Sequence, residues 1–208
     1  MKSLDILPSS LLKGQLESLA DLYLRADTAV AHFARASGVS CPDGCGLCCE
    51  GFVPDILPLE AAYVAVWLAG TEHERAVALT SGTLSPRIGK DGKSGCPLYN
   101  PDTPYHCTVY ESRPLICRMF GFAGTRDKLG APTFSVCRHG VSDRGARTAS
   151  GAALVDVFGM EPPVMAGYGS GLVSIDPDSA GNRKPLPEIL PAAIGRVLFL
   201  IGMTERSL

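Results

Sequence analysis

Cysteine is the residue type that gives this chain its chemistry. The sequence holds eight cysteines, and four of them, Cys41, Cys45, Cys48 and Cys49, fall within nine residues. The other four, Cys96, Cys107, Cys117 and Cys137, form a second group further along the chain. Thiolate sulfur is a ligand that both zinc and iron–sulfur clusters take from proteins. The two groups therefore predict a metal site to which all eight cysteines contribute.

The spacing of the first group supports this interpretation. Cys41, Cys45 and Cys48 follow a C-x3-C-x2-C pattern with intervening glycines, and such short steps let a tight turn aim successive sulfurs at one point. Cys48 and Cys49 are adjacent, and neighbouring side chains usually diverge. We therefore expect the doublet either to serve two centres or to supply one ligand while the other cysteine packs.

Several arrangements remain open from the sequence. Eight cysteines suffice for two four-sulfur sites, which can be alike or can pair zinc with an iron–sulfur cluster. One site with several buried free thiols, reduced thiols without metal, and a disulfide framework are the alternatives. The doublet and the surplus of ligands favour an iron–sulfur cluster, most simply [4Fe–4S], over zinc.

Charged groups beside the second cysteine group are further candidates. Arg113 and Arg118 flank Cys117 and are expected to bind the cofactor by offsetting the negative charge of a thiolate centre. Ordinary surface salt bridges are the alternative for both arginines. His106 and His139 lie close to cysteines in the sequence and are weaker candidates for ligands.

Composition limits the class of protein. The chain has 208 residues, 46% of them hydrophobic, and a formal net charge of −2, so it has no overall basic field to attract nucleic acid. The N-terminal apolar run is broken by Asp5 and Pro8. The longest apolar candidate, Ile189 to Met203, is shorter than the roughly 18–20 residues of a spanning helix. We therefore expect a cytoplasmic protein that binds neither nucleic acid nor membrane.

Apolar periodicity predicts a mainly α fold with short β-strands. We expect a single small domain of about four to five helices around an irregular, cysteine-ligated metal centre. Helices are predicted from Ser9 or Ser10 to Gly38, from Pro58, from Thr71 to about Thr80, from Pro114, and from about Leu190 to Ile201. Short strands are expected at Cys107–Tyr110, at Thr133–Cys137 and after Gly171, with a hairpin tip at Asp91-Gly92.

The chain divides into three regions in this interpretation. Residues 1–40 form an amphipathic helix that packs on the core, residues 41–139 bind the metal, and residues 140–208 contribute a loop and a C-terminal helix to the same domain.

The cysteine pattern resembles that of bacterial cysteine-cluster proteins with a zinc- or iron-chelating domain named CxxCxxCC. The first block here is Cys41, Cys45, Cys48 and Cys49. The second is Cys96-Pro97 followed by Cys107-Thr-Val-Tyr-Glu-Ser-Arg-Pro-Leu-Ile-Cys-Arg118, and Cys137 matches a later cysteine. This chain has three residues between Cys41 and Cys45, where the family name implies two. The resemblance implies a bound zinc or iron centre and implies no reaction.

These observations favour a metal-binding protein whose centre has a structural or redox role. No acid–base or nucleophile set is evident, which argues against an enzyme. The C-x3-C-x2-C spacing also occurs in radical S-adenosylmethionine enzymes, so radical chemistry is one alternative. S-adenosylmethionine-dependent methyl transfer is a second, and it is implied only by the resemblance, because related domains occur in flagellin lysine methylases. A redox- or iron-sensing module that binds a protein partner is another, since the apolar stripe from Leu12 to Phe33 is a possible docking face.

Overall fold

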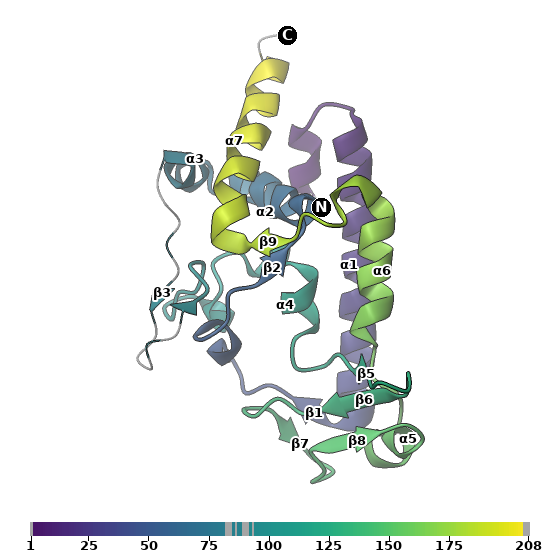
Figure 1. Cartoon of the computed structure of the whole chain (residues 1–208). Coiled ribbons are helices and arrows are strands. Elements are labelled where there is room, and N and C mark those ends of the chain that lie inside the picture. Colours follow the sequence, from purple (N-terminus) through teal and green to yellow (C-terminus); the bar gives the residue numbers. More distant parts are fainter. Residues whose placement is uncertain (1, 82–84, 86, 89–91, 93, 206–208) are drawn as a thin grey trace. The chain divides into compact units, whose positions relative to one another are not determined.

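The fold is mainly helical, as the sequence predicts. The computed structural model describes residues 2–81, 85, 87–88, 92 and 94–205. It is 55% helix and 13% strand and has seven α-helices in this part of the chain. The helices are α1 (Leu11–Ser37), α2 (Pro58–Thr71), α3 (His73–Ser81), α4 (Leu115–Met119), α5 (Ala153–Phe158), α6 (Met165–Ile175) and α7 (Leu186–Glu205) (Figure 1).

The strands are short and form small antiparallel sheets. They are β1 (Val39–Ser40), β2 (Asp55–Ile56), β3 (Arg87–Ile88), β4 (Ser94–Gly95), β5 (Thr125–Arg126), β6 (Pro132–Ser135), β7 (Val141–Ser142), β8 (Thr148–Ser150) and β9 (Lys184–Pro185). β1 pairs with β7, β2 with β9 and β3 with β4, while β5, β6 and β8 form a three-stranded sheet. Two of these sheets, β1–β7 and β2–β9, join segments that lie far apart in the sequence.

The contacts divide the chain into two compact units, which are described separately. Unit 1 comprises Met1–Asp21, Gly46–Pro114 and Val173–Leu208, and unit 2 comprises Leu22–Cys45 and Leu115–Leu172. Helix α1 contributes its first part to unit 1 and its remainder to unit 2. Neither unit is one continuous stretch of sequence, so the three sequence regions do not map onto them one to one.

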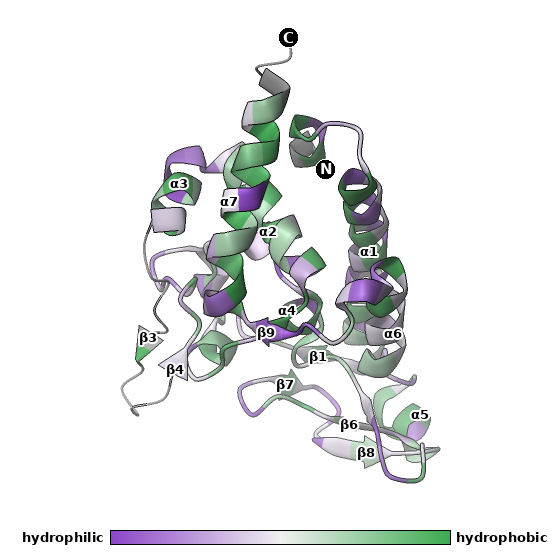
Figure 2. Ribbon diagram, turned by 45° about the horizontal axis from the view of Figure 1, so that its top comes forward, coloured by the Kyte–Doolittle hydropathy of each residue, from purple (hydrophilic) through white to green (hydrophobic). Residues whose placement is uncertain are grey.

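Unit 1 is built on the packing of α7 against α2 and α3. Leu59, Tyr63, Leu190, Ile194 and Val197 are among its buried side chains. Figure 2 colours most of α2 and α7 as hydrophobic, as expected for helices that share a core. Because both helices are apolar over much of their surface, they can pack on several neighbours at once.

The start of α2 is fixed by a buried carboxylate. The side chain of Glu60 is 1% exposed, and its Oε2 accepts a hydrogen bond from the Leu57 backbone N–H at 2.9 Å. The same oxygen lies 3.7 Å from Nη1 of Arg183, just before β9. The Glu60 carboxylate therefore satisfies one backbone donor at the helix start and one basic side chain.

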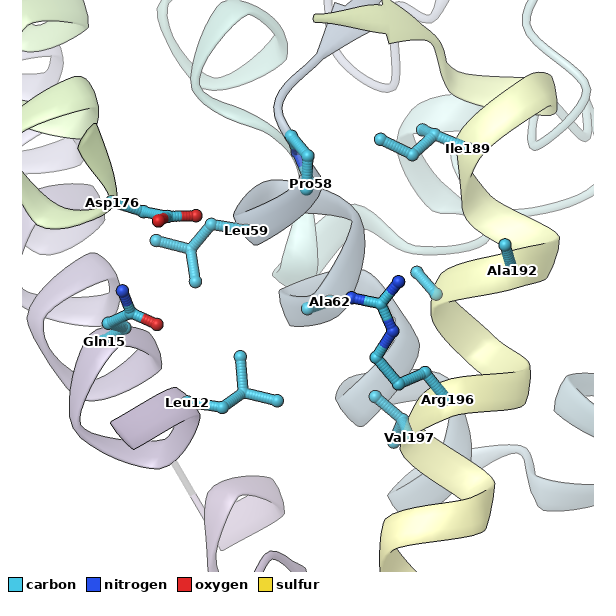
Figure 3. Close-up of a pocket in the computed structure, with 11 residues that line it drawn as sticks. Leu12, Gln15, Pro58, Leu59, Ala62, Asp176, Ile189, Ala192, Arg196 and Val197 are labelled. Atoms are coloured by element: carbon cyan, nitrogen blue, oxygen red, sulfur yellow. The ribbon is translucent and has the colours of Figure 1, made fainter. Parts of the chain in front are cut away.

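A groove of about 200 Å³ lies between helices of unit 1. Figure 3 shows Leu12 and Gln15 of α1, Leu59 and Ala62 of α2, and Arg196 of α7 among its lining residues. None of the lining residues is a cysteine. The groove is thus separate from the predicted metal ligands.

The expectation that no segment is long enough to cross a membrane is wrong for α7. Leu186–Met203 is long and apolar enough by length and composition, and 22% of it is buried. By itself this is weak evidence, because a core helix passes the same test. α7 packs on α2 and α3, with Leu190, Ile194 and Val197 buried.

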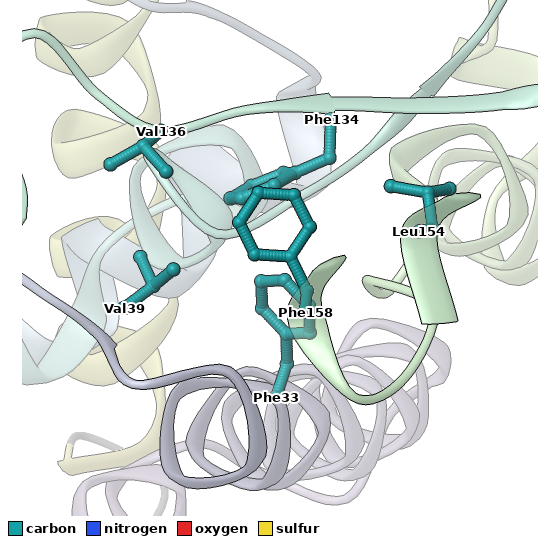
Figure 4. Close-up of a cluster of buried hydrophobic side chains, with 6 residues drawn as sticks. All are labelled: Phe33, Val39, Phe134, Val136, Leu154 and Phe158. Atoms are coloured by element: carbon teal, nitrogen blue, oxygen red, sulfur yellow. The ribbon is translucent and has the colours of Figure 1, made fainter. Parts of the chain in front are cut away.

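Unit 2 has an aromatic core. Phe33 of α1, Phe134 of β6 and Phe158 of α5 pack together, with ring centroids 4.9 to 6.2 Å apart (Figure 4). Val39, Val136 and Leu154 complete the buried cluster. Edge-to-face aromatic pairs of this kind add to the free energy of area burial. The cluster ties α1, β1, β6 and α5 into one body.

The predicted helices are all present, but the described part of the chain has seven α-helices where four to five were expected, and most of its short strands were not predicted. Individual elements also differ from the predictions. The segment 152–171 forms α5 and most of α6, and the strand expected after Gly171 lies within α6. Residues Tyr110–Ser112 form a 3₁₀ turn, so the strand predicted at Cys107–Tyr110 is reduced to a single bridge at Cys107. β6 ends at Ser135, short of Cys137. Strands β3 and β4 pair, while Asp91 of the predicted tip lies outside the described residues.

Candidate metal centre

The eight cysteines fall equally into the two units. Unit 1 contains Cys48, Cys49, Cys96 and Cys107, and unit 2 contains Cys41, Cys45, Cys117 and Cys137. All eight are described, and none forms a disulfide. The division separates the first sequence block between Cys45 and Gly46. The disulfide framework is therefore not seen, and each unit offers four thiols.

Two glycines allow the chain segments of the unit 1 set to approach closely. A Cβ on Gly95 would lie 2.4 Å from the carbonyl oxygen of Glu50 and 2.9 Å from that of Cys49. Because nothing larger than glycine fits at position 95, the next residue, Cys96, can donate its backbone N–H to the Cys49 oxygen at 2.9 Å. This contact places Cys96 beside the Cys48-Cys49 doublet.

The third segment of the set carries Cys107. Cys107 forms an antiparallel bridge with Tyr99, and the Asn100 N–H donates to the carbonyl oxygen of His106 at 3.0 Å. A Cβ on Gly46 would lie 2.2 Å from the Cβ of His106. The backbone before Cys107 therefore packs directly against the turn that leads to the doublet.

Two residues before Cys107 adopt an unusual backbone. Tyr105 and His106 have φ values of 58° and 52°, the left-handed region that non-glycine residues rarely occupy. Such conformations cost about 1–3 kcal/mol each and cluster at functional sites, where the surrounding contacts hold them. Here the contact with Gly46 and the bridge at Cys107 hold the turn.

The doublet itself presents two sulfurs side by side. Sγ of Cys48 and Sγ of Cys49 lie 3.9 Å apart. Zinc–sulfur bonds of about 2.3 Å in a tetrahedral site place ligand sulfurs roughly 3.8 Å apart. The expectation that the two side chains diverge is therefore wrong, because the 3₁₀ turn Leu47–Cys49 brings both thiols to the same side.

The thiols of the set affect one another electrostatically. The hydrogen bond with the Cys49 thiol, assisted by the Arg113 charge, lowers the pKa of Cys48 to about 7. Burial raises the pKa of Cys96 to about 11, and the Cys107 charge contributes to this increase. Burial also raises the pKa of Cys107, against the opposing effect of Arg113. Without metal, Cys48 therefore ionises more readily at neutral pH than Cys96 or Cys107 does.

Arg113 lies close enough to the thiols for its charge to lower the pKa values of Cys48 and Cys107. Its guanidinium carbon is 3.5 Å from the centroid of the Tyr110 ring, and Tyr105 stacks on Tyr110 with centroids 4.2 Å apart. A guanidinium over an aromatic face is held without losing its charge. The side chain therefore has a fixed position from which it acts on Cys48 and Cys107.

Arg118 has a different environment, in unit 2. Its Nη1 donates to Oδ2 of Asp27 at 2.6 Å, and its guanidinium lies 4.3 Å from the centroid of the Tyr23 ring. The side chain is 6% exposed. These contacts join α4 to α1 and give Arg118 a structural role. A contribution to cofactor binding stays a prediction for both arginines.

The two candidate histidines make other contacts. Nδ1 of His106 lies 3.4 Å from the Tyr99 hydroxyl, with the rings packed edge to face. Nε2 of His139 accepts a hydrogen bond from Nε of Arg138 at 2.8 Å. Both histidines remain beside cysteines in sequence, and neither is needed to complete a set of four thiols.

The site also has members that the sequence did not identify. Glu50 and Tyr99 join two segments of the unit 1 set, because the Tyr99 hydroxyl donates to Oε1 of Glu50 at 3.3 Å. Gly95, directly before a cysteine, was a signal available in the sequence. In the part of the chain that the structure describes, no three histidine, cysteine or acidic side chains are grouped closely enough to hold a metal ion. The metal centre therefore stays a prediction, while the four-thiol donor set fits zinc or iron chemically.

Comparison with known proteins gives one match. Residues 40–138 match the family CxxCxxCC, described as a putative zinc- or iron-chelating domain. No curated protein and no solved structure matches the chain. The match covers both cysteine groups and ends just after Cys137. The cysteine-bearing region of this chain, residues 40–138, is therefore similar to the CxxCxxCC domain, which is described as a putative zinc- or iron-chelating domain.

Proposed function

We propose that the chain binds a zinc or iron ion through the thiolates of Cys48, Cys49, Cys96 and Cys107, in a structural or redox role. The observation that supports this most directly is the 3.9 Å separation of the Cys48 and Cys49 sulfurs. The close contacts of Gly46 with His106 and of Gly95 with Glu50 support it further, because they bring the backbone segments that carry Cys96 and Cys107 close to the segment of the doublet.

A single tetrahedral ion fits the doublet better than a [4Fe–4S] cluster does. Two sulfurs at this spacing can share one metal ion. In a [4Fe–4S] cluster each iron takes one cysteine, so the ligand sulfurs lie further apart, on different corners of the cluster. The [4Fe–4S] form favoured by the sequence pattern remains the competing proposal for the same residues.

The surrounding charges suit a tetrathiolate site. Four thiolates around a divalent ion leave a net negative charge, which nearby cations stabilise. Arg113 supplies one, held over Tyr110. Arg75 supplies another, since its charge also lowers the pKa of Cys107 and its Nη2 donates to Thr108 Oγ1 at 2.6 Å. A reducing compartment such as the cytoplasm would keep the thiols available.

Metal analysis of protein purified without oxygen tests the proposal. We expect bound zinc or iron, and we expect the Cys96→Ser variant to hold about one ion fewer than the native protein. Acid-labile sulfide together with absorption bands in the visible spectrum would instead identify an iron–sulfur cluster. Folded native protein that contains neither zinc nor iron would rule out the proposed function.

The same preparation separates a structural from a redox role. A zinc site leaves the protein colourless and inert to dithionite, whereas iron held by thiolates is coloured and changes its spectrum on reduction. Removal of a structural ion by a chelator lowers the unfolding temperature, because binding to the native state adds to stability.

A further inference from the structure

Helix α7 turns one side to the core of unit 1 and the opposite side to solvent. Its buried side chains recur at helical spacing and are Leu186, Leu190, Ile194 and Val197. Only 22% of the apolar stretch Leu186–Met203 is buried. Most of an apolar helix is therefore uncovered within the chain, and continuous exposed apolar surface of this kind marks an interaction site.

The exposed face of α7 carries two charges of opposite sign. Glu188 and Arg196 are the only charged residues in that apolar stretch, and both are exposed. They lie four residues before and four residues after the exposed Ala192, so the three residues share one side of the helix. In the part of the chain that the structure describes, neither charge has an ion-pair partner.

We propose that α7 is the interface of a homodimer, in which the α7 helices of two copies pack antiparallel about a two-fold axis at Ala192. Glu188 and Arg196 are equally far from Ala192, about 6 Å along the helix. The axis therefore places each Glu188 level with Arg196 of the second copy, and two ion pairs form across the contact. A parallel dimer would place each charge beside its own equivalent, so the charges select the antiparallel arrangement.

Small side chains allow the two helices to approach closely at this point. Gly195 is exposed beside Ala192, and a Cβ built on it would meet nothing within 4 Å. Because α7 begins at Leu186, it overlaps the second copy over residues 186–198. Phe199, which is 65% exposed on the same face, lies beyond that overlap. The centre of the contact thus holds small residues, with the two ion pairs at either end.

A lipid surface is the alternative partner for an apolar helix face. Helices that lie on membranes carry several lysines or arginines on their polar face. The apolar stretch of α7 has no net charge, and both of its charged residues lie on the face that would enter the lipid. Placing Glu188 and Arg196 there without partners costs free energy, which pairing across a dimer avoids. The charges therefore favour a second copy of the chain.

Charge reversal and charge exchange test the dimer on the full chain. Sedimentation equilibrium of the native protein should show a mass that rises with concentration from 21.9 kDa towards twice that value. Glu188→Arg and Arg196→Glu each create like-charge contacts on both sides of the axis, so each should raise the dimer dissociation constant about tenfold or more. The exchange Glu188→Arg/Arg196→Glu recreates both ion pairs and should restore the native constant. Glu161→Arg, at an exposed residue of unit 2, is the control and should leave the constant unchanged.

Three results overturn the dimer. The first is a native protein that is monomeric at every concentration, and the second is a dimer that neither charge reversal weakens. The third is an exchange variant that dimerises as weakly as the single variants. Flotation of a monomeric native protein with phosphatidylcholine vesicles would assign the face to lipid. Because α7 contains no cysteine, all variants should keep the native metal content, so failure of the dimer leaves the proposed function untouched.

Discussion

The sulfur of Cys48 lies 3.9 Å from the sulfur of Cys49. Adjacent residues in an extended strand point to opposite faces, so this proximity depends on the 3₁₀ turn that contains both. The separation is that of two ligands for one ion, which is why the proposed function assigns the doublet to one centre together with Cys96 and Cys107.

The pKa values predict an order of thiol reactivity in metal-free protein. Since the thiolate is the reactive form, Cys48, with a pKa of about 7, should alkylate faster than Cys96 and Cys107 at neutral pH. Cys96, with a pKa of about 11, should react slowly until the protein unfolds. Pulse alkylation with iodoacetamide at several pH values, read by peptide mass spectrometry, gives both profiles.

The Arg113→Gln variant tests whether the Arg113 charge contributes to the low pKa of Cys48. The arginine charge lowers the pKa of Cys48, so its removal should move the Cys48 profile to higher pH. The sign follows because the cation favours the thiolate over the thiol. Equal rates for Cys48 and Cys96 at neutral pH would contradict the predicted order.

Gly95 is expected to be indispensable to the close approach of Cys96 to the Cys48-Cys49 doublet. A methyl group there would meet the Glu50 carbonyl oxygen at 2.4 Å, and backbone atoms cannot move aside cheaply. We expect Gly95→Ala to lower the free energy of unfolding by about 1–3 kcal/mol. It should also weaken metal retention, because the hydrogen bond from Cys96 to Cys49 would break. Urea unfolding and metal analysis measure the two effects.

Gly14→Ala provides the matched control. Gly14 lies within α1, and a Cβ there meets nothing within 4 Å. Alanine is about 1 kcal/mol more favourable than glycine inside a helix, so this variant should be slightly stabilised and should keep its metal. A Gly95→Ala protein as stable as Gly14→Ala would show that the close approach is not needed.

Local apolar patterns made much of the helical fold predictable. The stripe from Leu12 to Phe33 gave α1, because its residues repeat with the period of a helix. The same reasoning missed α6, whose glycines lower helix propensity. One of them, Gly171, has a structural reason: its Cβ would lie 3.3 Å from Leu22 Cδ1, so glycine lets α6 approach α1 closely.

Local sequence patterns could not predict which cysteines lie in the same unit, because long-range contacts decide this. All eight cysteines could be identified as candidates from their spacing, but their division into two sets follows from long-range contacts. The pairing of Ser40 with Val141 is one such contact, and the approach of Gly46 to His106 is another. The left-handed backbone at Tyr105 has no sequence signal, since glycine usually occupies that region.

The ion pair of Arg118 with Asp27 is expected to stabilise unit 2. Nη1 of Arg118 lies 2.6 Å from Oδ2 of Asp27, and the arginine is buried while the aspartate is 41% exposed. Asp27→Asn leaves a buried guanidinium without its counter-charge. We expect a loss of about 1–3 kcal/mol, below the value for a fully buried pair because solvent screens the carboxylate. Urea unfolding followed by circular dichroism gives the difference.

Asp5→Asn is the control for this pair. Asp5 lies 4.0 Å from Lys13 and is 81% exposed, so its removal should change stability by less than about 0.5 kcal/mol. If Asp27→Asn leaves stability unchanged and lowers metal content instead, then Arg118 serves the metal centre, as the sequence suggested, and its structural role is wrong.

The aromatic cluster is expected to hold β1 and β6, the strands that lead to Cys41 and Cys137 of unit 2. Phe158 is fully buried and contacts both Phe33 and Phe134, so Phe158→Ala should lower the free energy of unfolding by about 3–5 kcal/mol. Because β6 leads to the half-buried Cys137, loosening the cluster should also speed labelling of Cys137 by N-ethylmaleimide more than labelling of the unit 1 thiols. Phe199→Ala is the matched control, since Phe199 is 65% exposed and its loss should leave stability nearly unchanged. An equal increase in labelling at Cys137 and at the unit 1 thiols in Phe158→Ala would show that the cluster does not hold the Cys137 segment specifically.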